Sequence, residues 1–259
     1  PVSPVDEFYA DVAAGLAAAR ERSTADVIAV PGLAVPVPER AKVLCAGLNY
    51  VDHAKEAERP VSERPDVFAR WASTLVPDGA EVPLPVNEPG LDWEGELAAI
   101  VAVDLRNATP AEVEAGLLGF TCLNDLSARM HQRATPQWAI GKNADGSAPV
   151  GPDIVTPDEL GDPYTLRLQT RVDGRIMQDG TTADMIFRIG EIGAYASETM
   201  TLRPGDVIST GTPPGIGSTR KPPVFLTGGE RVEVEIDGIG VLVTRIAASY
   251  DGATTPKAG

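Results

Sequence analysis

The chain has 259 residues, of which 43% are hydrophobic and 23% charged, a balance typical of a globular protein with one large domain or two small ones. Its formal charge of -15 argues against nucleic-acid binding, because no basic block could neutralise phosphates. No apolar run approaches the roughly 18 residues of a membrane helix, and the first residues lack a signal-peptide pattern, so we expect a cytoplasmic protein without membrane contact. Cys45 and Cys122 stand in separate apolar stretches and are expected to be buried thiols.

In chain order, residues 1–40 predict a small N-terminal appendage: a helical pattern, a short strand at 26–30 and a Pro-rich link. Residues 41–250 contain many short β-like runs separated by Gly, Pro and Asp turns. Fewer helices are expected, near VDHAKEAE, TPAEVEAGLL, DLSARMHQR and EIGAYASETM. This mixture, without a βαβ repeat, predicts an α+β, mainly β fold, followed by a frayed tail at 251–259.

The stretch LDWEGEL, residues 91–97, places Asp92, Glu94 and Glu96 on the same side of an expected strand. Because this strand continues into apolar AAIVAV, unpaired carboxylates would be costly and a positive partner is expected. Asp125 ends a second apolar strand, so Glu94, Glu96 and Asp125 could form an oxygen-only site suited to Mg²⁺ or Mn²⁺. The alternative is that both glutamates line a solvated sheet face and Asp125 caps a helix.

The stretch AGLNYVDHAKEAE predicts a strand that turns into a helix. His53 and Glu56 then lie three residues apart on one helical face. A carboxylate that accepts a proton from one imidazole nitrogen leaves the other free to act as a base, so this pair could activate a water. A plain surface ion pair is the alternative. His131 is the chain's other histidine, so candidates for imidazole chemistry are few.

Several residues are candidate binders of an acidic substrate. Arg129 and Gln132, at i and i+3, could hold a carboxylate, Lys142 could hold an oxyanion, and Arg70 could add charge. Taken singly, each could be ordinary surface charge. The loop STGTPPGIG lacks the GK[ST] of a phosphate-binding loop; its Thr212 could close over a ligand, or the loop could be structural.

Six segments resemble the fumarylacetoacetate hydrolase family in order and spacing, specifically its acylpyruvase and 2-hydroxyhepta-2,4-diene-1,7-dioate isomerase branch. The resemblance spans about residues 41–247, and the segments read GLNYVDHAKE, DWEGEL, NDLSARMHQ, GKNADGSAPVGP, RIMQDGTTADMIF and TLRPGDVISTGTPPGIG. The resemblance implies a mixed β-roll or β-sandwich with flanking helices, a homodimer, and a Mg²⁺ or Mn²⁺ that binds the enol or keto acid end of the substrate.

Matched motif by motif, the resemblance also implies roles for single residues. The metal ligands would be Glu94, Glu96 and Asp125. Asp92 is not implied as a ligand. The other implied residues are a water-activating dyad, a lysine near the reacting carbonyl and two substrate-binding side chains: His53 with Glu56, Lys142, and Arg129 with Gln132.

The chain departs from the family pattern at three positions. Met130 stands where the family commonly has the acid of SARDxQ. Arg70 replaces the lysine of FxK, and Trp71 stands where proline is often found. Arg presents a planar fork rather than a point charge, so the two cations are not equivalent. We therefore expect a substrate with a bulkier or less polar acyl group than fumarate.

The leading hypothesis is a metal-dependent hydrolase that cleaves a carbon–carbon bond in a β-diketo acid such as an acylpyruvate. The metal would stabilise the leaving enolate, His53 with Glu56 would deprotonate water, and Lys142 would hold the oxyanion. The same site could instead decarboxylate an oxaloacetate-like acid or isomerise a hydroxydienoic acid. A non-catalytic metal-binding protein and a ureido-type C–N lyase are further alternatives. In every enzymatic case the expected partner is a small acid, and for the leading hypothesis a 2-oxo acid.

Overall fold

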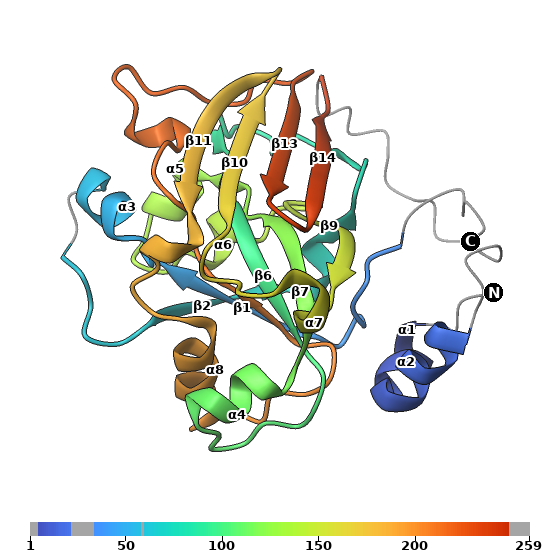
Figure 1. Cartoon of the computed structure of the whole chain (residues 1–259). Coiled ribbons are helices and arrows are strands. Elements are labelled where there is room, and N and C mark those ends of the chain that lie inside the picture. The colour runs from blue at the N-terminus through green and yellow to red at the C-terminus, as the bar shows by residue number, and fades with distance from the viewer. Residues whose placement is uncertain (1–4, 22–33, 58–59, 249–259) are drawn as a thin grey trace.

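The computed structural model describes residues 5–21, 34–57 and 60–248 (Figure 1). Strands outnumber helices among the described residues, and the expectation of an α+β, mainly β fold is confirmed. Within these ranges no helix has the length and apolar character needed to cross a membrane. The predicted strand at 26–30 and the predicted frayed tail at 251–259 lie outside the described residues.

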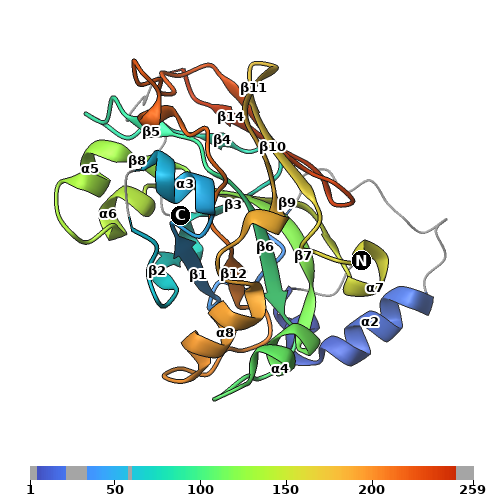
Figure 2. The ribbon, with the colours of Figure 1, turned by 60° about the vertical axis from the view of Figure 1, so that its left-hand side comes forward.

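A seven-stranded mixed sheet forms the centre of the molecule (Figures 1 and 2). Its strand β6 is buried along its whole length because side chains cover both faces of the sheet. This double burial explains the uninterrupted apolar run that follows Glu96. In spatial order the strands are β2 (Asp66–Trp71), β1 (Lys42–Gly47), β12 (Val207–Ser209), β6 (Gly95–Val101), β7 (Leu117–Asn124), β9 (Ala148–Val155) and β3 (Leu75–Pro77).

A five-stranded sheet packs over one face of the central sheet, and side chains of both sheets form the largest hydrophobic core. Leu97 of the central sheet and Leu168 and Val234 of the second sheet belong to that core. A separate two-stranded pair joins β5 (Leu91–Asp92) to β8 (Ser127–Ala128). The second sheet has the order β11 (Arg175–Thr181), β10 (Arg167–Val172), β13 (Arg231–Ile236), β14 (Gly240–Ile246) and β4 (Glu81–Val82).

Helices flank the sheets, and the expected helices are present in shortened form. Thr109 begins α4 with a capping box: its hydroxyl accepts from the Glu112 amide at 3.3 Å, and the Glu112 carboxylate accepts from the Thr109 amide at 2.8 Å. The helices are α1 (Val5–Ala10), α2 (Val12–Glu21), α3 (Val51–Glu56), α4 (Pro110–Ala115), α5 (Arg129–Arg133), α6 (Ala139–Lys142), α7 (Pro157–Leu160) and α8 (Ile189–Ser197), with 3₁₀ turns η2 (Ala72–Thr74), η3 (Thr182–Asp184) and η4 (Gly217–Thr219).

The N-terminal helices rest on the central sheet. Tyr9 of α1 is buried with Val37 and Val43 in the core that covers the face opposite the second sheet. Its hydroxyl also donates to the Pro36 carbonyl at 2.9 Å. The boundary between an appendage and a main domain near residue 40 stays a prediction.

The expected continuous strand through LDWEGEL is interrupted, which corrects the sequence reading. β5 ends at Asp92 and β6 begins at Gly95. At Gly95 the second sheet approaches so closely that a Cβ would collide with Thr170. The amides of Glu94 and Gly95 donate to side chains, Asn124 Oδ1 at 3.2 Å and Gln178 Oε1 at 3.0 Å. Asp92, which lies before this break, is not part of the carboxylate cluster that Glu94, Glu96 and Asp125 form.

Substitution of Leu97, a core residue of β6, tests the packing between the two sheets. Leu97→Ala removes a fully buried side chain, so we expect the free energy of unfolding to fall by about 2–5 kcal/mol. Val103→Ala, at a side chain that is 48% exposed, should change it by less than about 0.5 kcal/mol. Urea titration followed by circular dichroism measures both. Equal, small losses would contradict the packing described.

Candidate active site

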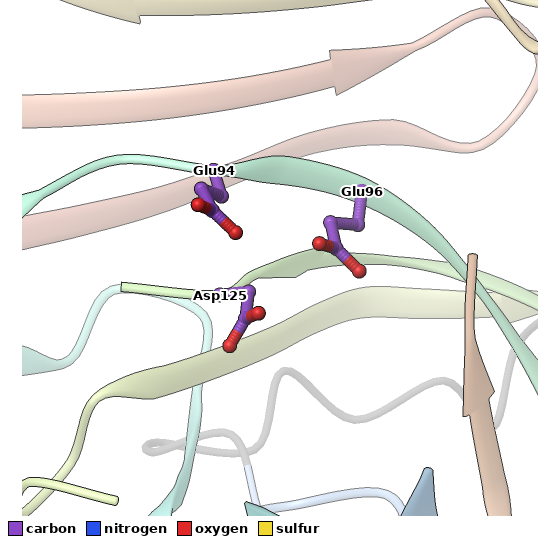
Figure 3. Close-up of side chains that lie close together, drawn as sticks. All are labelled: Glu94, Glu96 and Asp125. Atoms are coloured by element: carbon purple, nitrogen blue, oxygen red, sulfur yellow. The ribbon is translucent and has the colours of Figure 1, made fainter. Parts of the chain in front are cut away.

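Three carboxylates meet where the strands β6 and β7 adjoin. One oxygen from each of Glu94, Glu96 and Asp125 lies within 4.8 Å of the others, and the side chains point toward one another (Figure 3). β6 and β7 are antiparallel, with Gly95 opposite Asn124, so the start of one strand lies beside the end of the other. All three residues are buried. The alternative of a solvated sheet face with Asp125 as a helix cap is therefore wrong.

Buried cations surround these carboxylates, as their cost in a core required. The Lys142 ammonium donates to Glu94 at 2.7 Å and to Asp125 at 2.5 Å. Arg129 forms a 2.6 Å ion pair with Glu94. Burial raises the pKa of Glu94, but Lys142 and Arg129 outweigh burial and hold it well below the usual range. The positive partner expected from the sequence is thus present, as lysine and arginine side chains.

Glu96 has a different environment. Its Oε2 accepts from the Ser209 hydroxyl at 2.5 Å and the Gly211 amide at 3.0 Å, and no lysine or arginine of the described ranges forms an ion pair with it. Burial, together with the negative charges of Asp125 and Glu94, raises its pKa well above the ordinary value. A cation beside Glu96 would relieve this repulsion.

The donor set fits a divalent metal ion. Its oxygens are all carboxylate oxygens, the type that Mg²⁺ and Mn²⁺ prefer. Around the triad, four buried carboxylates face three buried side-chain cations, so negative charge is in excess: Asp92, Glu94, Glu96 and Asp125 against Arg70, Arg129 and Lys142. Glu94, Glu96 and Asp125 would hold the ion.

The predicted dyad lies on α3. His53 Nδ1 is 3.5 Å from Glu56 Oε2, and both side chains line the cavity described below. Glu56 also accepts from the Gly215 amide at 3.1 Å. Burial raises the pKa of Glu56, but the nearby His53 and Thr219 side chains and the Gly215 amide outweigh burial and lower it overall. A carboxylate that stays ionised can stabilise a protonated imidazole.

Asn49 fixes the turn between β1 and α3. Its amide donates to the carbonyls of Thr210 at 2.8 Å and Phe187 at 2.9 Å, and its Oδ1 accepts from the Phe187 amide at 2.8 Å. Leu48, just before it, has a positive φ of 51°. These bonds hold the start of α3 beside the loop that carries Thr212.

A cavity of about 1080 Å³ brings most of the predicted residues together. In Figure 2, α3, α5 and α6 lie on the same side of the molecule, and each contributes to the lining. Phe68 and Trp138 form an aromatic wall with ring centroids 5.3 Å apart. The predicted residues in the lining are His53, Glu56, Glu94, Glu96, Arg129, Gln132, Lys142 and Thr212.

Arg70 is not in that lining, which corrects its expected contact with substrate. Its guanidinium donates to Asp125 Oδ1 at 2.6 Å and to the Ser147 carbonyl and hydroxyl at 2.5 and 2.6 Å. Asp125 is also absent from the lining and is fully buried. Arg70 therefore orients the carboxylate of Asp125 from behind the cavity wall.

The sequence did not reveal the partners of Asp92, for which only a positive neighbour was expected, or any role for Gln178. Asp92 accepts from Arg129 Nε at 2.8 Å and from the Gly217 and Ser218 amides at 2.7 and 2.9 Å. It thereby joins a cavity-lining arginine to the loop after β12. Gln178 of β11 donates to the Thr212 hydroxyl at 2.7 Å. Their partners lie 34 or more residues away, so local patterns could not reveal them.

Comparison with known proteins identifies the family. The family profile described as fumarylacetoacetate (FAA) hydrolase C-terminal matches residues 42–247. The chain belongs to this family. It is 40% identical over 246 residues to a mitochondrial oxaloacetate tautomerase of Homo sapiens, covering 93% of this chain and 78% of that protein.

Two further fumarylacetoacetate hydrolase relatives extend the comparison. A 2,4-didehydro-3-deoxy-L-rhamnonate hydrolase of a Sphingomonas strain is 40% identical over 230 residues, covering 87% of this chain and 81% of that protein. A crystal structure of a Mycobacterium smegmatis protein provisionally described as HpcE has a TM-score of 0.89 and 34% identity, covering 95% of this chain and 88% of that one. The β-roll with flanking helices expected from the resemblance is confirmed.

Substitution of Glu96 tests the proposed metal site without an activity assay. Glu96→Gln removes one ligand charge and also the repulsion from Asp125 and Glu94. We expect Mg²⁺ or Mn²⁺ affinity to fall by at least about tenfold, while the metal-free protein melts at a higher temperature than wild type. Calorimetric titration and thermal unfolding with chelator measure the two effects. Unchanged metal affinity would rule out Glu96 as a ligand.

Proposed function

We propose that the chain is a divalent-metal-dependent tautomerase that interconverts the keto and enol forms of a small 2-oxo acid such as oxaloacetate. One observation carries the proposal. A buried carboxylate triad adjoins a His–Glu dyad in a chain that is 40% identical, over 93% of its length, to a human protein named as an oxaloacetate tautomerase. The metal is proposed to be Mg²⁺ or Mn²⁺, on the basis of the oxygen-only ligands.

The bound ion would supply Lewis-acid stabilisation of negative charge on the 2-oxo oxygen of the substrate. Arg129 and Gln132 would bind the substrate carboxylate with directed hydrogen bonds. Burial lowers the pKa of Lys142, but Asp125 and Glu94 outweigh burial and raise it overall. Lys142 therefore stays protonated and acts as a fixed positive charge near the reacting oxygen, not as a base.

His53 is the proposed base. In the keto-to-enol direction it takes a proton from C3, and the electron pair of that C–H bond forms the C2–C3 double bond. The carbonyl π pair moves to the 2-oxo oxygen, which gains a proton from water, and the imidazolium gives its proton back to the resulting hydroxide. In the reverse direction the imidazolium returns a proton to C3. Glu56, which stays ionised, stabilises the imidazolium in both directions.

Hydrolysis of an acylpyruvate-like β-diketo acid is the second candidate. A cavity of about 1080 Å³ leaves room beyond a four-carbon acid for an acyl chain and a water molecule. The same dyad could activate that water, and one relative is named as a hydrolase. Decarboxylation of an oxaloacetate-like acid would need the same enolate without water, and no contact in the site favours it.

A substrate panel distinguishes these reactions. We expect the purified protein with Mg²⁺ or Mn²⁺ to accelerate the keto–enol relaxation of oxaloacetate, followed by enol absorbance, and chelator to abolish the acceleration. Product analysis with acylpyruvates tests hydrolysis, which would release pyruvate and a free acid. Release of carbon dioxide from oxaloacetate would contradict the tautomerase proposal and favour decarboxylation.

Substitution of His53 tests the proposed base. His53→Ala should reduce kcat by about 10²–10⁴-fold, because general-base catalysis is lost, while Mg²⁺ affinity stays near that of wild type. Lys55→Ala is the matched control on α3, since Lys55 is exposed and pairs only with Asp52 among the described residues. Turnover by His53→Ala at the rate of the Lys55→Ala control would overturn the assignment.

We also propose that the chain forms a homodimer, as the family resemblance implies. Light scattering of the purified protein measures its molar mass in solution. A monomer at micromolar concentration would contradict this proposal.

A further inference from the structure

The helix α5 carries two cavity-lining residues, Arg129 and Gln132, but it has only five residues. A helix of one turn is not stable alone. Its first amides have no acceptors within the helix, and its N-terminal neighbour Ala128 provides no side-chain cap. The position of α5 must therefore be set by residues outside it.

Glu88 supplies the missing acceptors. One carboxylate oxygen accepts from the amides of Gly90 at 2.8 Å and Met130 at 3.2 Å. The other accepts from the His131 amide at 3.1 Å and lies 2.8 Å from His131 Nδ1. The Glu88 side chain has no exposed surface. A buried carboxylate with four such contacts fixes the first turn of α5 closely.

We propose that Glu88 is a positioning residue for substrate binding, which holds α5 so that Arg129 and Gln132 point into the cavity. This inference rests on the proposed function, because it assigns those two side chains to the substrate carboxylate. Neither local spacing nor the cavity lining singles out Glu88, since its side chain lies behind α5.

The segment that follows Glu88 continues the contact. The Gly90 carbonyl accepts from the Arg129 amide at 3.1 Å, and β5 then pairs with β8, with Leu91 opposite Ala128. A Cβ at position 90 would lie 2.9 Å from the Glu88 carboxylate and 3.3 Å from Arg129 Cβ, so glycine permits this approach. The chain then reaches Glu94, so one short segment connects the contact with α5 to a proposed metal ligand.

Both cavity-lining side chains of α5 depend on the position of its first turn. Arg129 donates to Asp92 at 2.8 Å and to Gln132 at 2.9 Å, and it pairs with Glu94 at 2.6 Å. If the first turn of α5 moved, Arg129 could keep its carboxylate partners only by changing its side-chain conformation. Gln132, one turn later, would lose its place in the cavity.

The chemistry of the contact requires a carboxylate at position 88. All four partners are N–H groups or a ring nitrogen that can donate, and a carboxylate only accepts. A glutamine would turn an NH₂ group toward at least one donor.

Burial raises the pKa of Glu88, but hydrogen bonds from His131 and the Met130 and Gly90 amides outweigh burial and lower it, so the carboxylate stays ionised. Met130, at the position where the family commonly has an acid, is 56% exposed and has no carboxylate that could replace Glu88.

Glu88→Gln tests the proposal, with Glu159→Gln on the exposed face of α7 as the matched control. We expect KM for the 2-oxo acid to rise about tenfold, the effect of losing one hydrogen bond to a charged group, with kcat and Mg²⁺ affinity within twofold of wild type. Glu88→Asp, which keeps the charge, should recover part of the KM. Hydrogen–deuterium exchange should be faster for the Met130 and His131 amides in Glu88→Gln.

A second readout separates this inference from the proposed function. Calorimetric titration with oxalate and Mg²⁺ measures binding of a non-reacting acid, with an expected loss of about tenfold in Glu88→Gln. Absent turnover with intact oxalate binding would refute the function alone. Unchanged KM and oxalate affinity with only a lower melting temperature would overturn the positioning role, as would equal loss of kcat and metal binding. A wild-type protein that binds no oxalate would refute both.

Discussion

The burial of excess negative charge is the constraint on which the rest of the site depends. A buried carboxylate costs several kcal/mol unless it is paired, and removal of one partner from a buried ion pair typically costs about 3–5 kcal/mol. The fold meets this cost by aiming three cations at the carboxylates from three separate elements, β2, α5 and α6: Arg70, Arg129 and Lys142. Glu96 is left without a cationic side chain among the described residues, which is where a metal ion adds most.

The same ion pairs determine which residues can do chemistry. Two carboxylates accept from the Lys142 ammonium and raise its pKa, so the role we propose for it is to stabilise charge. We propose that His53 transfers the proton, and the Gly215 amide and neighbouring donors lower the pKa of its partner Glu56. In this proposal the Lys142 ion pairs stabilise charge at one end of the cavity, and His53 with Glu56 acts as the base at another.

Much of the site could be predicted from the sequence because its signals are local. Glu94 and Glu96 are two residues apart at the start of β6, and His53 and Glu56 share a helical face, so both pairs follow from the periodicity of extended chain and helix. The supporting contacts are not local. Arg70 reaches Asp125 from 55 residues away, and the break after Asp92 reflects the approach of Thr170, a residue of another sheet. The fold class followed from the number of strands, but the interrupted strand required the packing of two sheets.

In the proposed reaction a metal ion held by the triad would make C3 of a bound 2-oxo acid more acidic, and His53 would remove its proton. The most direct measurement is exchange of the C3 hydrogens of oxaloacetate with deuterated solvent, followed by proton NMR with Mg²⁺ and with chelator. We expect fast, metal-dependent exchange that His53→Ala abolishes and Lys55→Ala preserves. Exchange at the uncatalysed rate by the metal-loaded wild-type protein, or equal exchange with His53→Ala, would contradict it.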